Sequence, residues 1–131
     1  MFITDKELSA LTEVARNTPR LRMNQDLRTS ANDSSQRMLN ALEPGTVLPI
    51  HRHKNTSETM VIVKGALIER FYDDKGNITE EHRMKPDGKY PIVQIPAGQW
   101  HSLEVLESGT VIFEAKDGAY KPLTEDEILT I

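Results

Sequence analysis

The chain has 131 residues and a mass of 14.8 kDa, a size that predicts one domain with a hydrophobic core of its own. It contains no cysteine, which excludes disulfides, cysteine-ligated zinc and thiol catalysis. The 16 Lys and Arg residues against 20 Asp and Glu residues give a net charge of −4. Because no basic excess is present to neutralise phosphates, we expect no nucleic-acid partner.

The sequence gives no sign of a membrane span or a secretion signal. Its longest apolar run is far shorter than the ~18 residues that a spanning helix needs. The N-terminus carries Asp5 and Glu7 early and has no basic start followed by an apolar stretch, so we expect no signal peptide. The absence of cysteine fits a reducing compartment, and we expect a cytoplasmic protein.

Residues 4–16 are predicted to form an amphipathic helix. Thr4 and Glu7 make a capping box, and Leu8 and Leu11 begin an apolar stripe at helical spacing. Pro19 ends the helix, because a proline disfavours helical geometry in the residue before it. Residues 19–34 fit either an edge strand or an ordered arm.

From residue 36 the apolar period becomes two, which is typical of strands. The predicted strands cover residues 36–42, 46–53, 58–63, 66–72, 78–84, 90–95, 101–106 and 110–115. Short strands without intervening helices indicate an antiparallel sandwich or small barrel rather than a parallel α/β sheet. Thr124 and Glu127 form a second capping-box pair, which predicts a short helix over residues 124–131.

Three histidines and one glutamate stand at spacings suited to a metal ion. His51 and His53 are two apart, so in a strand both imidazoles face the same side. Glu58 opens the next predicted strand, and His101 starts a later one. Imidazoles with a carboxylate suit Fe, Mn, Zn, Ni, Co or Cu, and four protein ligands leave up to two positions open on a six-coordinate ion.

These residues resemble the two motifs of the cupin family. Gly45, five residues, His51-Arg52-His53, four residues, Glu58, six residues and Gly65 match the first motif, and Pro96-Ala97-Gly98-Gln99-Trp100-His101 matches the second. The resemblance implies an all-β fold: a small antiparallel, jelly-roll-like cupin barrel with an N-terminal helix. It also implies one divalent transition metal per chain (Fe, Mn, Zn, Ni or Co), held by His51, His53, Glu58 and His101.

The likeness extends over nearly the whole chain to WbuC-type cupin-fold metalloproteins of the RmlC-like cupin superfamily. It is carried by Pro19-Arg20-Leu21-Arg22-Met23-Asn24, Gln36-Arg37-Met38-Leu39, Ala41-Leu42-Glu43-Pro44-Gly45-Thr46 and Val111-Ile112-Phe113-Glu114-Ala115-Lys116-Asp117-Gly118. Ser57 stands where that family often has Trp before the glutamate, and Val105 stands where cupins usually have Asn. The domain organisation expected is an N-terminal helix and arm over 1–34, the barrel over 35–120 and a tail over 121–131.

The family resemblance implies a role in surface polysaccharide (O-antigen) synthesis. We expect a metal-dependent enzyme, an isomerase, epimerase or lyase, that acts on a small anionic carbohydrate-type metabolite. The alternatives are a non-catalytic metal- or ligand-binding or regulatory module, and an Fe(II)-dependent dioxygenase. A homodimer is expected, because a partner subunit commonly covers the exposed sheet edge of such barrels.

Several other polar residues are candidates for ligand binding or proton transfer. Arginine forks bind phosphates and carboxylates bidentately, so the substrate-binding candidates are Arg20, Arg22, Asn24 and Arg37. Glu69 and Tyr72 are candidate acid or base groups if they face inward, whereas Glu114 is expected to point outward, opposite an apolar face. A second group is assigned no chemistry: His82 is expected to be solvated, Trp100 to pack in the core, and Met60 and Ile62 to line the barrel.

Overall fold

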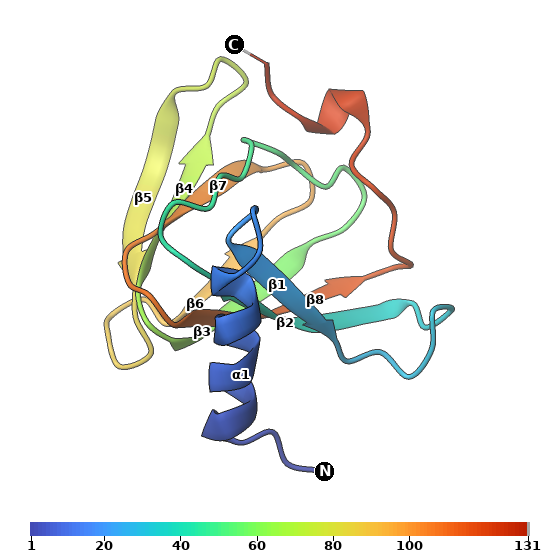
Figure 1. Ribbon diagram of the computed structural model, residues 1–131. Coiled ribbons are helices and arrows are strands. Elements are labelled where there is room, and N and C mark those ends of the chain that lie inside the picture. The colour runs from blue at the N-terminus through green and yellow to red at the C-terminus, as the bar shows by residue number, and fades with distance from the viewer. Residues whose placement is uncertain (131) are drawn as a thin grey trace.

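The computed structural model describes residues 1–130, which form two antiparallel β-sheets and an outer helix (Figure 1). The elements are α1 (Asp5–Arg16), β1 (Arg22–Asp26), β2 (Ser35–Leu42), β3 (Glu58–Lys64), β4 (Leu67–Tyr72), β5 (Ile78–Met84), β6 (Ile92–Ile95), β7 (Trp100–Val105), β8 (Thr110–Asp117) and the short 3-10 helix η1 (Glu125–Glu127). One sheet has the strand order β1-β2-β8-β3-β6, and the other has the order β5-β4-β7. The predicted all-β antiparallel class with an N-terminal helix is confirmed.

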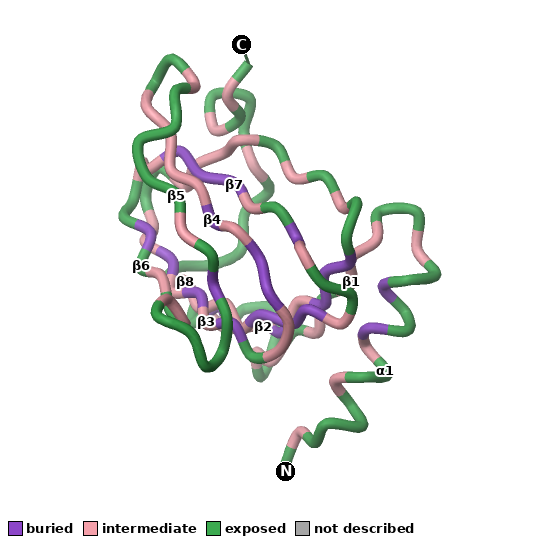
Figure 2. The backbone as a smooth tube through the Cα atoms, turned by 90° about the vertical axis from the view of Figure 1, so that its left-hand side faces the viewer, coloured by how far each residue is buried: buried purple, intermediate pink, exposed green. Residues whose placement is uncertain are grey.

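The apolar residues form two clusters on opposite faces of the larger sheet. The inner cluster fills the space between the sheets and contains Leu42, Met60, Ile62, Leu67, Met84, Val105 and Ile112. The outer cluster joins Ala15 of α1 to Leu39, Ala41 and Val111 of the sheet. Alternation along β2 and β8 produces this division, since successive side chains of a strand face opposite sides. The burial pattern follows it, and the buried positions lie along the facing strands (Figure 2).

The predicted helix and seven of the eight predicted strands lie close to where the sequence places them. Thr4 is the N-cap of α1, and Thr4 and Glu7 form the expected capping box. The segment 19–34 contains the edge strand β1, paired with β2. In the tail, Thr124 caps η1, while Ile131, the last residue of the predicted C-terminal helix, lies outside the described residues.

The predicted strand over residues 46–53 is wrong. Only His51 in this segment forms strand-like pairs, through isolated bridges to His101 of β7 and to Ile128 of the tail. Pro49 has no N–H to offer to a ladder, and Val47 is 79% exposed, so the segment lacks both the hydrogen bonds and the burial of a strand.

Within residues 1–130, no helix combines the length and the hydropathy that crossing a bilayer requires.

Candidate metal centre and cavity

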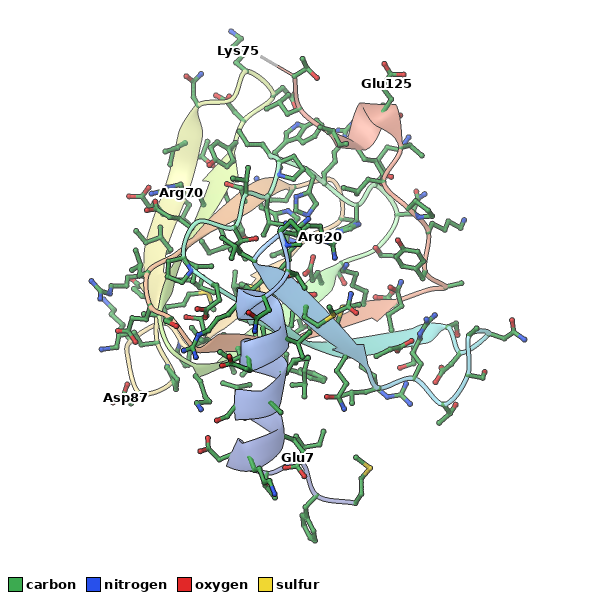
Figure 3. The ribbon with its side chains drawn as sticks, in the orientation of Figure 1. Glu7, Arg20, Arg70, Lys75, Asp87 and Glu125 are labelled. Carbon is green, nitrogen blue, oxygen red and sulfur yellow. The ribbon has the colours of Figure 1, made fainter. Side chains whose placement is uncertain are left out.

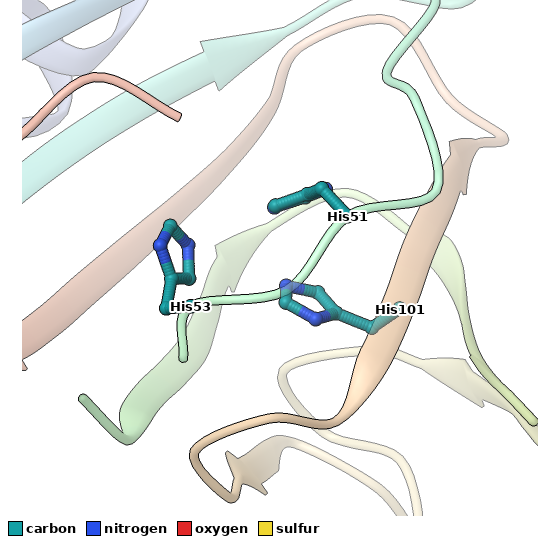
Figure 4. Close-up of side chains that lie close together, drawn as sticks. All are labelled: His51, His53 and His101. Atoms are coloured by element: carbon teal, nitrogen blue, oxygen red, sulfur yellow. The ribbon is translucent and has the colours of Figure 1, made fainter. Parts of the chain in front are cut away.

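Three histidines from two segments of the chain lie close together (Figure 4). His101 belongs to β7, and His51 lies beside it in the irregular segment before β3. The two backbones are joined in both directions: His51 N donates to His101 O at 3.0 Å, and His101 N donates to His51 O at 2.9 Å. His53 is fixed by its carbonyl oxygen, which accepts from Gly98 N at 2.9 Å. The loop of the second motif is thereby tied to the first motif.

One donor nitrogen from each imidazole lies within 4.8 Å of the other two. The ring centroids of His51 and His101 are 4.3 Å apart, and that of His53 is 5.3 Å from His51 and 6.0 Å from His101. Arg52 points elsewhere and lies over the Trp100 ring, 4.3 Å from its centroid. The side chains of residues 51, 52 and 53 therefore alternate in direction although the segment is not a strand, and the imidazoles of His51 and His53 lie on the same side.

Two of the imidazoles have their tautomer fixed by the backbone. Nδ1 of His51 is 2.9 Å from Pro49 O, and Nδ1 of His101 is 3.0 Å from Gln99 O. A carbonyl oxygen only accepts, so each Nδ1 carries the proton and each Nε2 presents a lone pair. Metal-binding histidines are commonly oriented in this way by a backbone carbonyl.

Glu58 begins β3 and completes the group. Its Oε2 atom lies 3.6 Å from Nε2 of His53 and 3.6 Å from Nε2 of His101. These separations exceed hydrogen-bonding distance, and both Glu58 Oε2 and His53 Nε2 are buried without a hydrogen-bond partner. Buried polar atoms are normally paired, so two buried atoms without a hydrogen-bond partner are what a site for a metal ion held by both side chains requires.

The protonation states suit a cation. Burial, followed by the neighbouring His101, lowers the pKa of His51 to about 4. Burial and the charge of Lys116 lower the pKa of His53. Burial by itself would raise the pKa of Glu58, but His101, Lys116 and His53 outweigh it and hold that pKa at about 2. At neutral pH His51 and His53 are thus neutral imidazoles and Glu58 is an ionised carboxylate, and these donors fit a divalent transition metal.

A cavity of about 770 Å³ opens beside this group. Its walls carry amide side chains from β1 and β2, lysines at positions 54, 116 and 121, and acidic side chains from several elements. Asp117 at the end of β8 and residues 118–124, which follow it, line the cavity as well. Met60 lines the cavity and Ile62 lies in the adjoining core, exposed by 1% and 2%, which confirms the predicted apolar lining.

The structure separates the four residues predicted to bind substrate. Arg22 and Asn24 line the cavity, and Arg22 Nη1 already donates to Val47 O at 3.1 Å. Arg20 lies exposed at the turn before β1 and is outside the cavity (Figure 3). Arg37 lies on the opposite face of β2 from the cavity-lining Gln36, and it pairs with Asp33 at 3.0 Å. The alternation along β2 directs Arg37 away.

The prediction that Glu114 points outward is wrong. Glu114 lines the cavity, where burial and the negative charge of Glu58 raise its pKa to about 8. The apolar face of β8 that carries Val111 and Phe113 packs on the outer cluster beneath α1, so the opposite face, with Glu114, is the interior. The sequence does not show which of the two faces of β8 a helix covers.

Glu69 faces inward and lines the cavity, whereas Tyr72 is bonded through its hydroxyl to Ser102 Oγ at 2.7 Å. Trp100 is 7% exposed and its Nε1 donates to Asp74 Oδ1 at 2.9 Å, a packing role as expected. His82 lies apart from the three clustered histidines and pairs with Glu80.

Sequence reasoning missed the C-terminal wall of the site. Arg52 N donates to Glu127 O at 3.0 Å, and Lys54 N donates to Glu127 Oε2 at 2.9 Å. Lys54 Nζ also pairs with Asp126. The tail therefore holds the segment that carries His51 and His53. The capping box at Thr124 is the one sequence feature that points to structure in the tail. It predicts a helical turn there, but it does not predict which part of the protein that turn contacts.

Residues 3–84 match the family model described as "Domain of unknown function (DUF6016)". No curated protein matches the chain.

Solved structures share the fold at low sequence identity. Capsular polysaccharide assembling protein CapF from Staphylococcus aureus is 24% identical with a TM-score of 0.66, over 80% of this chain and 30% of CapF. KdgF from Halomonas sp. is 15% identical with a TM-score of 0.62, over 78% of this chain and 83% of KdgF. The cupin domain of Schizosaccharomyces pombe Cnp3 is 16% identical with a TM-score of 0.60, over 78% of this chain and 68% of that domain. The chain thus has the cupin fold, and it spans about 30% of the length of CapF.

Proposed function

Since the chain belongs to the family described as Domain of unknown function (DUF6016), we propose its function from the site: it binds one divalent transition metal per chain. The ligands in this proposal are His51, His53, Glu58 and His101, and the metal is Fe, Mn, Zn, Ni or Co. The observation that carries the proposal is the buried Glu58 Oε2, which lies 3.6 Å from two imidazole nitrogens and bonds to neither.

We further propose that the protein is a metal-dependent enzyme acting on a small anionic carbohydrate-type metabolite. A metal bound there would polarise a carbonyl or hydroxyl oxygen, chemistry that supports isomerisation, epimerisation or a lyase reaction. Lys116 and Lys121 line the cavity and form no ion pair within residues 1–130, so their ammonium groups are available to an anionic ligand. Asn24 and Asn40, paired across β1 and β2, supply hydrogen-bonding groups for hydroxyls.

The pathway proposed is surface polysaccharide (O-antigen) synthesis. It is supported by the sequence resemblance to WbuC-type cupins and by the likeness in fold to CapF, a capsular polysaccharide assembling protein.

We also propose a cytoplasmic homodimer. The strands β1, β5 and β6 are sheet edges with unpaired backbone groups that a second subunit would cover, and sedimentation velocity at micromolar concentration tests this.

The metal assignment is tested with His51→Ala and the matched control His82→Ala. Elemental analysis after loading and desalting should give one metal per wild-type chain and per His82→Ala chain, and a loss of stoichiometric metal in His51→Ala. Full occupancy in His51→Ala, or equal loss in both variants, would contradict the ligand assignment.

The enzymatic assignment is tested by screening sugar nucleotides and sugar acids for thermal stabilisation of the metal-loaded protein, followed by product analysis of any compound that binds. Stabilisation with turnover supports the enzyme, and stabilisation without turnover supports a binding or regulatory module. Consumption of dioxygen with such a compound would instead show an oxygenase.

A further inference from the structure

A second cavity, of about 250 Å³, lies where the two sheets are not hydrogen-bonded to each other. β5 is an edge of the smaller sheet and β6 is an edge of the larger one, and the cavity has walls from both. We call it the seam cavity. Its apolar lining residues are Phe71, Met84, Tyr90, Ile92 and Val93, and its polar ones are Glu69, Glu80, His82 and Gln94.

Glu69 forms the inner wall of the seam cavity. It lies in β4, opposite His82 of β5 in the strand register, and it lines both this cavity and the larger one. Its residue exposure is 5%, yet neither carboxyl oxygen has a hydrogen-bond partner. Leaving a buried carboxyl unpaired is costly, so such a group is expected to meet a ligand.

No side chain of the described residues forms an ion pair with Glu69. The charged groups that act on it are Glu58 of β3 and Glu114 of β8, both of its own sign, and they add to burial in raising its pKa. His82, the nearest titratable group across the strand pair, is engaged by Glu80 at 3.1 Å and stacks on the Tyr90 ring at 4.1 Å between centroids. The interior beside Glu69 is therefore short of positive charge.

We propose that the seam cavity binds a small organic ammonium ion, with Glu69 accepting its N–H groups and the apolar walls enclosing its carbon body. A hard metal ion fits this place poorly, since it needs several oxygen ligands. Glu69 is the one buried carboxyl group of the lining, Glu80 pairs with His82, and Gln94 Oε1 accepts from Thr59. An anion fits poorly as well, because the lining includes two acidic residues, Glu69 and Glu80, and its one basic side chain, His82, is already paired with Glu80. The volume is below the ~300–1,000 Å³ of pockets for drug-sized ligands, which selects a compact amine.

The test uses n-butylammonium chloride as the probe and metal-free, EDTA-treated protein at constant ionic strength. Calorimetric titration should show saturable one-to-one binding, and 1-butanol, which has the same carbon body without the charge, should bind at least about tenfold more weakly because it lacks a charge-assisted hydrogen bond. Glu69→Gln should lower the butylammonium affinity by about tenfold or more. The exposed Glu107→Gln should leave it unchanged.

The location is read from backbone amide shifts in ¹⁵N-labelled wild-type protein, which needs no variant to fold. Butylammonium should shift Glu69, Ile92 and Val93. Shifts centred instead on Asn40 and Lys116 of the larger cavity, equal binding of butanol, or an unchanged affinity in Glu69→Gln would each overturn the proposal. His51→Ala should still bind butylammonium, so this proposal and the metal proposal fail separately.

Discussion

Gly65 follows β3 in a left-handed conformation, with φ at +82°. A β-carbon built there would lie 2.2 Å from Thr110 Oγ1 and 2.7 Å from Thr110 Cα. The second contact is with a backbone atom, so a rotation of the Thr110 side chain would not remove it. The spacing of the first motif predicts a glycine in this turn, but only the packing against β8 shows that the position also excludes a methyl group. Gly65 is therefore needed both for the turn after β3 and for the close approach of that turn to β8.

Gly65→Ala is expected to destabilise the protein severely, by more than the ~1 kcal/mol that a left-handed conformation alone costs a non-glycine residue. Gly109→Ala is the matched control, because Gly109 has a φ of +84° with no atom within 4 Å of the added carbon. Urea unfolding should show a loss of about 1 kcal/mol for Gly109→Ala and several times more for Gly65→Ala. Equal losses would show that the contact with Thr110 is relieved at little cost.

Asp33 provides a pH-dependent contact away from the metal centre. Backbone N–H groups of Ser35 and Thr29, together with Arg37, lower the pKa of Asp33 from 3.8 to about 2. A carboxyl whose pKa is lower in the folded protein adds stability above pH 3.8, and this is lost as the pH falls through about 2. Asp33→Asn should therefore be less stable than wild type at pH 6, and the difference should shrink towards zero in unfolding curves taken down to pH 2. A difference that stays constant with pH would contradict this account.

At the scale of elements, Glu43 attaches the helix to the barrel. It follows β2, is 6% exposed, and accepts from Arg16 of α1 at 3.2 Å, from Ser108 Oγ at 2.6 Å and from Gly109 N at 2.6 Å. The apolar stripe of α1 predicts that the helix packs on the protein. The ion pair and the loop between β7 and β8 determine where its last turn is held.

Glu43→Ala should lower the free energy of unfolding by about 1–3 kcal/mol, since it leaves the half-buried Gly109 N–H and the Ser108 hydroxyl without their acceptor. Glu13→Ala, which removes an exposed carboxylate paired with the same Arg16, should change it by less than about 0.5 kcal/mol. Thermal and urea unfolding of both variants compare them directly. A similar loss in the two would assign the effect to Arg16 rather than to the buried acceptor.

At the scale of the whole molecule, the candidate metal centre joins segments far apart in the chain. His51 and His53 precede β3, Glu58 begins it, and His101 comes from the other sheet. A ligand that binds only this folded arrangement stabilises it by RT ln(1 + [L]/Kd), about 2.7 kcal/mol at a hundred times Kd.

Loading with Zn²⁺ or Ni²⁺ at a hundred times Kd should therefore raise Tm by roughly 10 °C for a domain of this size. The shift should vanish in His101→Ala and persist in His82→Ala, as followed by scanning calorimetry. A shift that survives in His101→Ala would place the stabilising ion elsewhere. The Tm of metal-free His82→Ala, measured in EDTA, sets the baseline.

The sequence by itself determined the helix, seven strand positions and the four proposed ligands, because periodicity, capping and motif spacing are local properties of the chain. Only the tertiary structure decided which face of β8 is inside, and hence that Glu114 lines the cavity while Arg37 does not. It also decided that residues 46–53 are not a strand and that the tail braces His51 and His53. Alternation along a strand shows that its two faces differ in polarity. Which face a helix covers, and which segment the tail contacts, depend on packing between residues far apart in the sequence, and a local pattern does not contain that information.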